Sequence, residues 1–114
     1  MTPDSDSRFE PLSEEPPIVC NLDAAALGER ADEWRALVAW SVASVEVGAL
    51  AMRLVLRDSE ADLTAAVALA QREKHCCPFF DVSLELEADR RTLVMAVPGG
   101  AEETLAAFVA LFGQ

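Results

Sequence analysis

A regular alternation of apolar and polar or small side chains marks three short segments of the chain. Residues 50–56, 82–87 and 92–97 each carry an apolar side chain at every second position. Because successive side chains of a strand point to opposite faces, this spacing predicts three strands, each with one inward face. Residues 88–91 have the length and composition of a hairpin between the last two strands.

Helical spacing of apolar side chains marks three other segments. The first runs from about Asp23 to Val45 and includes Trp34, although its β-branched end leaves the last turn open. Asp58-Ser59 is placed to cap a second helix, which Pro78 must end because proline cannot continue a helix. An amphipathic third helix is predicted over residues 101–112.

The order of these elements predicts an α+β fold. We expect a three- to four-stranded, mostly antiparallel sheet with helices packed on one face. The strand-helix-strand-strand-helix part is ferredoxin-like, and Ile18–Cys20 is a candidate for a further strand. Residues 1–17 contain four prolines and five acidic residues, so we expect a flexible acidic tail before a single domain over residues 18–114.

Charge and hydropathy exclude several classes of function. The chain of 114 residues has a formal net charge of −11, and its nine basic residues are scattered. Binding to the phosphate backbone of nucleic acid, or to an anionic membrane surface, needs clustered Lys and Arg, so neither is expected. No apolar run is long enough for a membrane span, and the acidic start does not resemble a secretory signal. We therefore expect a cytoplasmic protein.

The candidate chemistry lies in the cysteines Cys20, Cys76 and Cys77. An odd number of cysteines without an export signal argues against a disulfide framework. In a reducing compartment such residues are free thiols, metal ligands or redox-active groups. They can equally be buried, because cysteine often packs as a small apolar side chain.

The adjacent pair Cys76-Cys77 supports a specific hypothesis. Neighbouring residues of a helix point about 100° apart, but Pro78 favours an extended Cys77 and so allows the two sulfur atoms to converge. Thiolates bind soft ions, and we consider Zn(II), Cu(I), Hg(II) and As(III). A third ligand would be His75 or Cys20. The sequence thus predicts soft-metal or metalloid binding, or thiol sensing, at these four residues.

Two other interpretations remain open. The domain could be a non-enzymatic interaction or self-association module, in which the cysteines are buried and Trp40 lies on a contact surface, so a homodimer or protein partner is considered. A thiol enzyme is less expected, because the pair lies at a helix C-terminus, where the helix dipole opposes a thiolate. No nucleophile motif or glycine-rich phosphate loop supports an enzyme either.

Several blocks of the sequence together resemble a known family. They are Ile18-Val19-Cys20-Asn21-Leu22, Arg30 with Trp34-Arg35-Ala36-Leu37, Glu73 with Cys76-Cys77-Pro78-Phe79-Phe80, and the Pro98–Ala101 turn. The chain after residue 17 is similar to a family of small bacterial proteins with a Cys-Cys-Pro-Phe motif, whose activity is not established. The resemblance implies one intact domain and draws attention to Cys20, Cys76 and Cys77, without implying a ligand.

Overall fold

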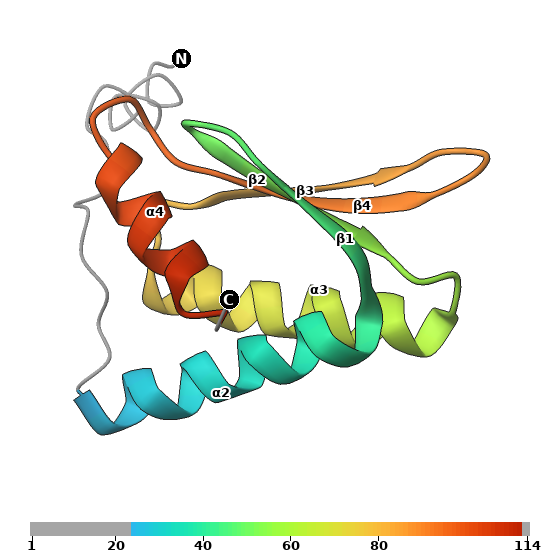
Figure 1. Ribbon diagram of the computed structural model, residues 1–114, viewed down its shortest axis with the longest axis horizontal. Helices are drawn as coiled ribbons and strands as arrows, with labels where there is room; N and C mark the ends of the chain where they lie inside the picture. The colour runs from blue at the N-terminus through green and yellow to red at the C-terminus, as the bar shows by residue number, and fades with distance from the viewer. Residues whose placement is uncertain (1–23, 113–114) are drawn as a thin grey trace, which may run out of the picture.

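The computed structural model describes residues 24–112, which form three helices and four strands (Figure 1). The elements in chain order are α2 (Ala24–Ser41), β1 (Val42–Val47), β2 (Ala51–Leu56), α3 (Glu60–Cys76), β3 (Asp81–Leu86), β4 (Arg91–Ala96) and α4 (Glu102–Ala110). The expected tail over residues 1–17 and the candidate strand Ile18–Cys20 lie outside the described residues.

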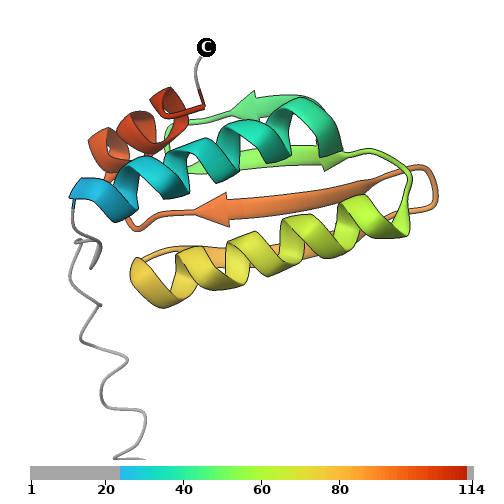
Figure 2. The ribbon, with the colours of Figure 1, turned by 90° about the horizontal axis from the view of Figure 1, so that it is seen from below.

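The four strands form one antiparallel sheet in the order β1-β2-β4-β3. All three helices lie on one face of this sheet, and no element within residues 24–112 covers the other face (Figures 1 and 2). The predicted α+β class is therefore confirmed. The ferredoxin-like order is not confirmed, because two strands precede α3 and no strand follows α4 within the described residues.

Strand β4 lies between β2 and β3, although β3 follows β2 in the chain. Each of these neighbours is antiparallel to β4, so β2 and β3 run parallel to each other, and α3 connects them across the helical face. Residues at the C-terminal end of α3 are thereby placed over the sheet beside α2, where the candidate site lies.

Helix α2 ends four residues before the predicted position. It stops at Ser41, and Val45 belongs to β1, where it pairs with Leu54. The prediction of a helix to Val45 is therefore wrong. The main-chain carbonyl of Ser41 accepts a hydrogen bond from the Arg57 N–H at 2.9 Å, a contact with the end of β2 that local sequence does not encode.

Helix α3 begins where the sequence predicts. The hydroxyl of Ser59 accepts a hydrogen bond from the Asp62 N–H at 3.1 Å, as an N-cap residue does. Val67 of this helix is exposed. The buried residues of α3 are Ala66, Leu69, Ala70 and Glu73. A charged residue thus occupies the last position of an otherwise apolar stripe.

The core lies between the helices and the inner face of the sheet. Trp34 of α2 is fully buried, and its ring meets Phe108 of α4 edge-on, with centroids 5.3 Å apart. Phe80 follows α3 and lies 5.0 Å from Phe108 between ring centroids. Phe79 and Phe80 are both buried at the corner between α3 and β3. These aromatic side chains enclose the C-terminal end of α3.

Candidate functional site

The carboxylate of Glu73 is the centre of the candidate site. The residue is only 3% exposed, and its oxygens accept three hydrogen bonds from other side chains. Oε1 accepts from Trp34 Nε1 at 2.9 Å and from Arg30 Nη1 at 3.1 Å, and Oε2 accepts from Cys77 Sγ at 3.1 Å. A buried carboxylate is costly unless it is paired and hydrogen-bonded, and here both conditions are met.

Cys77 is the inner thiol of the pair. It is the C-cap residue of α3, and its backbone is neither helical nor fully extended, with φ −127° and ψ 78°. Its N–H donates to the Glu73 carbonyl at 2.7 Å, while its thiol donates to the carboxylate of the same residue. Burial and this double attachment to Glu73 restrict access to its sulfur.

Cys76 is the outer thiol. It is half-buried, and its Sγ accepts a hydrogen bond from Arg30 Nη2 at 3.7 Å. The guanidinium thus places a positive charge beside the Cys76 sulfur. The two sulfur atoms therefore have different partners, a cation for Cys76 and a carboxylate for Cys77.

Arg30 connects the two thiol environments. Burial lowers the pKa of its guanidinium, but hydrogen bonds to Cys76 and Glu73, together with their negative charge, outweigh burial and raise that pKa above its ordinary value. Arg30 consequently stays charged over the whole pH range in which a thiol titrates. It also contacts Glu33 through Nε at 3.2 Å, and Glu33 in turn accepts from Arg72.

Two hollows reach the site, and Arg30 lines both of them. An open hollow of about 250 Å³ exposes Cys76 and is lined by Arg30, Arg72 and His75. An apolar cavity of about 270 Å³ reaches Glu73 and Cys77 from the side of α4, next to Phe108. Small reagents in solvent can therefore approach Cys76 directly, whereas the path to Cys77 leads through an apolar cavity.

The structure places three of the four predicted site residues. Cys76 and His75 line the same open hollow, and Cys77 points away from them toward Glu73. Cys20 lies outside the described residues. Within residues 24–112, no group of three or more His, Cys, Asp or Glu side chains is arranged to hold a metal ion.

Reasoning from residue patterns missed the roles of Arg30, Trp34 and Glu73. Glu73 follows Leu69 and Ala70 at helical spacing and precedes Cys77 by four residues. This spacing is that of the buried side of α3. A carboxylate at such a position requires buried donors elsewhere in the fold. The sequence therefore indicated that Glu73 has hydrogen-bond donors elsewhere in the fold, although it did not indicate which residues they are.

Comparison of the chain with protein-family models, curated proteins and solved structures finds no match. The resemblance to the family with the Cys-Cys-Pro-Phe motif therefore stays a prediction. No helix within residues 24–112 combines the length and the hydropathy needed to cross a membrane.

Proposed function

We propose that this domain is a thiol sensor, in which Cys76 is the residue that reacts. The observation that carries the proposal is the contact of Cys76 Sγ with Arg30 Nη2 at 3.7 Å, in a hollow open to solvent. Glu73 holds the guanidinium from its buried side at 3.1 Å. The cation beside Cys76 is thereby fixed in place and does not depend on a mobile surface side chain.

The proposed reaction is oxidation of Cys76 by a hydroperoxide. The thiolate sulfur attacks the terminal peroxide oxygen, the O–O bond breaks, and the leaving alkoxide or hydroxide takes a proton; the products are a sulfenic acid and an alcohol or water. A low-molecular-weight thiol then attacks the sulfenic sulfur, releases water and leaves a mixed disulfide on Cys76.

Cys77 is poorly placed to act as the resolving thiol. A trans peptide keeps adjacent Cα atoms about 3.8 Å apart, below the roughly 4.4–6.8 Å that disulfides usually span. In addition, Cys77 would have to leave its hydrogen bond to Glu73. An external thiol is the better partner for oxidised Cys76.

Soft-metal binding through both adjacent thiols is the weaker form of the hypothesis. A Cu(I), Hg(II), As(III) or Zn(II) ion bound by both sulfurs would require Cys77 to turn away from Glu73, which would leave a buried carboxylate with one donor fewer. His75 and Cys20 remain the candidates for a third ligand.

The test compares single-cysteine variants of the whole chain. Reduced protein is treated with hydrogen peroxide in the presence of glutathione, and the modified residue is located by peptide mass spectrometry. We expect one glutathione on Cys76, no modification in Cys76→Ser, and unchanged modification in Cys77→Ser and in the control Cys20→Ser. Modification only after unfolding would rule out a sensor.

The metal hypothesis is tested in parallel. Reduced protein is titrated with Zn(II), Cu(I), Hg(II) and As(III), and thiolate-to-metal absorbance is recorded for the same variants. Tight one-to-one binding that is lost both in Cys76→Ser and in Cys77→Ser would replace thiol sensing by metal binding. Weak binding through Cys76 alone would agree with the sensor.

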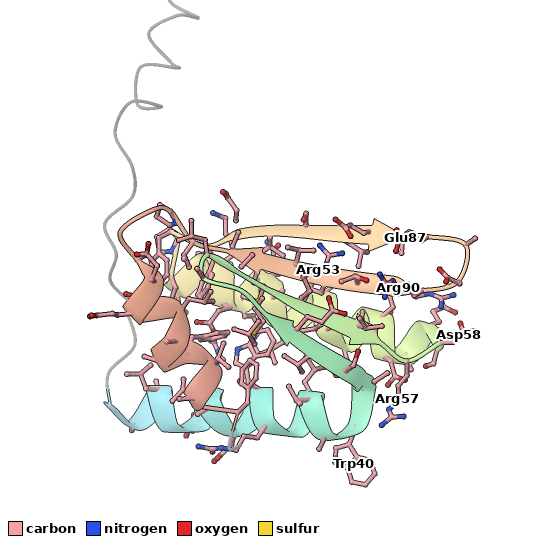
Figure 3. All side chains as sticks on the ribbon, turned by 45° about the horizontal axis from the view of Figure 1, so that its top comes forward. Trp40, Arg53, Arg57, Asp58, Glu87 and Arg90 are labelled. Carbon is pink, nitrogen blue, oxygen red and sulfur yellow. The ribbon has the colours of Figure 1, made fainter. Side chains whose placement is uncertain are left out.

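An interaction module is the second candidate, and one observation favours it. Trp40 is 77% exposed and projects from the end of α2 (Figure 3). Large exposed aromatic side chains are enriched at protein interfaces. If this function is correct, Trp40→Ala should abolish an association and leave the reactivity of Cys76 unchanged.

A further inference from the structure

The sheet has two edge strands, β1 and β3, and they differ in how well they are protected. Strand β1 contains an irregularity between Val42 and Ser44, of the kind that twists an edge and limits further pairing. Strand β3 is regular over Asp81–Leu86, and β4 is the only strand paired with it within the described residues. The better template for another strand is therefore β3.

The register of the sheet shows which main-chain groups of β3 point outward. The Glu87 N–H donates to the Arg90 carbonyl at 2.8 Å, which makes this a hydrogen-bonded pair at the hairpin. Hydrogen-bonded and non-hydrogen-bonded pairs alternate along antiparallel strands. It follows that Val82, Leu84 and Leu86 direct their N–H and C=O groups away from β4. On β1 the same reasoning gives Val45 and Val47 in the regular part of the strand, after the irregularity between Val42 and Ser44.

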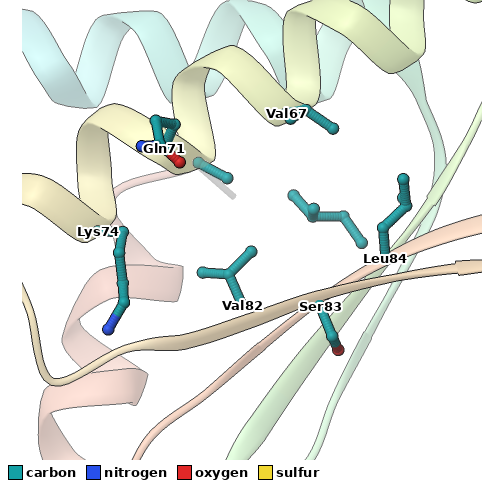
Figure 4. Close-up of a pocket in the computed structure, with 8 residues that line it drawn as sticks. Val67, Gln71, Lys74, Val82, Ser83 and Leu84 are labelled. Carbon is teal, nitrogen blue, oxygen red and sulfur yellow. The ribbon is translucent and has the colours of Figure 1, made fainter.

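The side chains of Val82, Leu84 and Leu86 lie on the face of the sheet that α3 covers. Leu84 is 36% exposed and Leu86 is 64% exposed, although both belong to the face that the helices cover. An apolar groove of about 320 Å³ runs between α3 and β3, with Val67 on one side and Val82 and Leu84 on the other (Figure 4). Apolar side chains and unpaired backbone groups therefore coincide along one edge.

We infer that β3 pairs with β3 of a second copy of this chain, antiparallel and centred on Leu84. This inference does not depend on the proposed thiol chemistry. In this register Leu84 lies opposite Leu84 of the second copy, and Val82 lies opposite Leu86. All three outward-facing residues then form hydrogen-bonded pairs, and the apolar side chains of both copies share one face of the continued sheet.

Charge selects this register over its neighbours. A shift in one direction places Asp81 opposite Glu85, and a shift in the other places Glu85 opposite itself; like charges in direct opposition destabilise pairing. In the register centred on Leu84, Glu85 lies opposite Ser83. Glu85 is moreover paired with Arg53 of its own chain at 2.6 Å.

Acidic side chains meet only at the outer ends of the paired strands. There Asp81 lies opposite Glu87, which is already paired with Arg90 at 3.2 Å. Arg53 and Arg90 thus reduce the repulsion that the acidic chain would otherwise impose on a second copy (Figure 3). The central register combines matched apolar side chains with like charges opposed only at its two ends, beyond the β3 residues Val82–Leu86.

A cysteine scan of the full-length chain tests the register directly. Hydrogen-bonded cross-strand Cα atoms are about 5.5 Å apart, within the span of a disulfide, so Leu84→Cys should form a symmetric 84–84 crosslink under mild oxidation. Leu86→Cys alone should not crosslink, because the two copies of residue 86 would be about 13 Å apart. When the Val82→Cys and Leu86→Cys variants are mixed, an 82–86 crosslink should form between one chain of each. Peptide mapping separates these bonds from those of the native cysteines.

The oligomeric state provides the second measurement. Sedimentation equilibrium should find a dimer of the unmodified chain, and Leu84→Arg should weaken it by at least about tenfold in dissociation constant. The matched control is Val45→Arg on β1, since Val45 is 37% exposed, and it should leave the dimer unchanged. Circular dichroism of both variants confirms that each is folded.

Two results would overturn the inference. One is a chain that stays monomeric at the highest concentration tested and gives no 84–84 crosslink, which would leave the edge to an extended segment of another protein. The other is a dimer that Leu84→Arg does not weaken, which would place the interface elsewhere, for example at Trp40.

Discussion

Cys76 and Cys77 are adjacent in the chain, yet their sulfur atoms face groups of opposite charge. Cys76 Sγ lies 3.7 Å from a guanidinium nitrogen of Arg30, and Cys77 Sγ lies 3.1 Å from a carboxylate oxygen of Glu73. The pair is therefore two separate thiols, one turned to an open hollow and one buried. Treating the dipeptide as a single chelating unit overlooks this difference.

The first prediction concerns their relative reactivity. In the folded protein, iodoacetamide should alkylate Cys76 at least about tenfold faster than Cys77, because Cys77 is only 3% exposed. Quenched time points analysed by peptide mass spectrometry give both rates in one experiment. In denaturant the two rates should become similar. Equal rates in the folded state would show that burial does not protect Cys77.

The second prediction concerns the buried carboxylate. Glu73→Gln keeps the shape of the side chain but removes the charge that faces Arg30 at 3.1 Å, and the two side chains are largely buried. Removing one partner of a buried ion pair is strongly destabilising, so we expect a loss of about 3 kcal/mol in the free energy of unfolding.

Urea denaturation measures this loss, and Glu33→Gln is the control. Glu33 also contacts Arg30, but it is exposed, so its replacement should change the unfolding free energy by less than about 0.5 kcal/mol. Similar losses in both variants would mean that the buried carboxylate contributes no more to stability than the exposed one.

The third prediction isolates one hydrogen bond of the network. Trp34→Phe removes the indole N–H that donates to Glu73 at 2.9 Å while retaining an aromatic ring beside Phe108. We expect a loss of about 2 kcal/mol from the hydrogen bond and the lost volume together. In a double-mutant cycle with Glu73→Gln, the two losses should fall short of additivity by about 1 kcal/mol. Full additivity would show that the two residues are not coupled.

Local signals in the sequence predict most of the fold. The strands over residues 51–56 and 91–96 follow from alternation, and the start of α3 follows from Ser59 as a cap. The end of α2 could not be predicted in this way, because no Gly or Pro follows Ser41 closely. That helix ends where Ser41 accepts a bond from Arg57, sixteen residues later in the chain. A helix end determined by tertiary contact leaves little trace in the adjacent residues.

The candidate site was predictable only in part for the same reason. The thiols are visible because they are adjacent in sequence. The groups that make them different lie on another helix, since Arg30 and Trp34 are 43 and 39 residues from Glu73. Patterns within a helix show which side chains face inward, but they do not show which partner each one meets.

The fourth prediction concerns Thr92, on the face of the sheet that the helices do not cover. Thr92 is fully buried, and its hydroxyl has no hydrogen-bond partner within the described residues. An unpaired buried hydroxyl costs free energy, so Thr92→Val, which replaces the hydroxyl by a methyl group of similar size, should stabilise the protein by about 1 kcal/mol. The control Thr92→Ser keeps the hydroxyl, loses a methyl group and should destabilise the protein by about 1 kcal/mol. Thermal and urea unfolding of both variants measure the change in the free energy of unfolding, which should have opposite signs. A less stable Thr92→Val would show that the hydroxyl forms a hydrogen bond in solution.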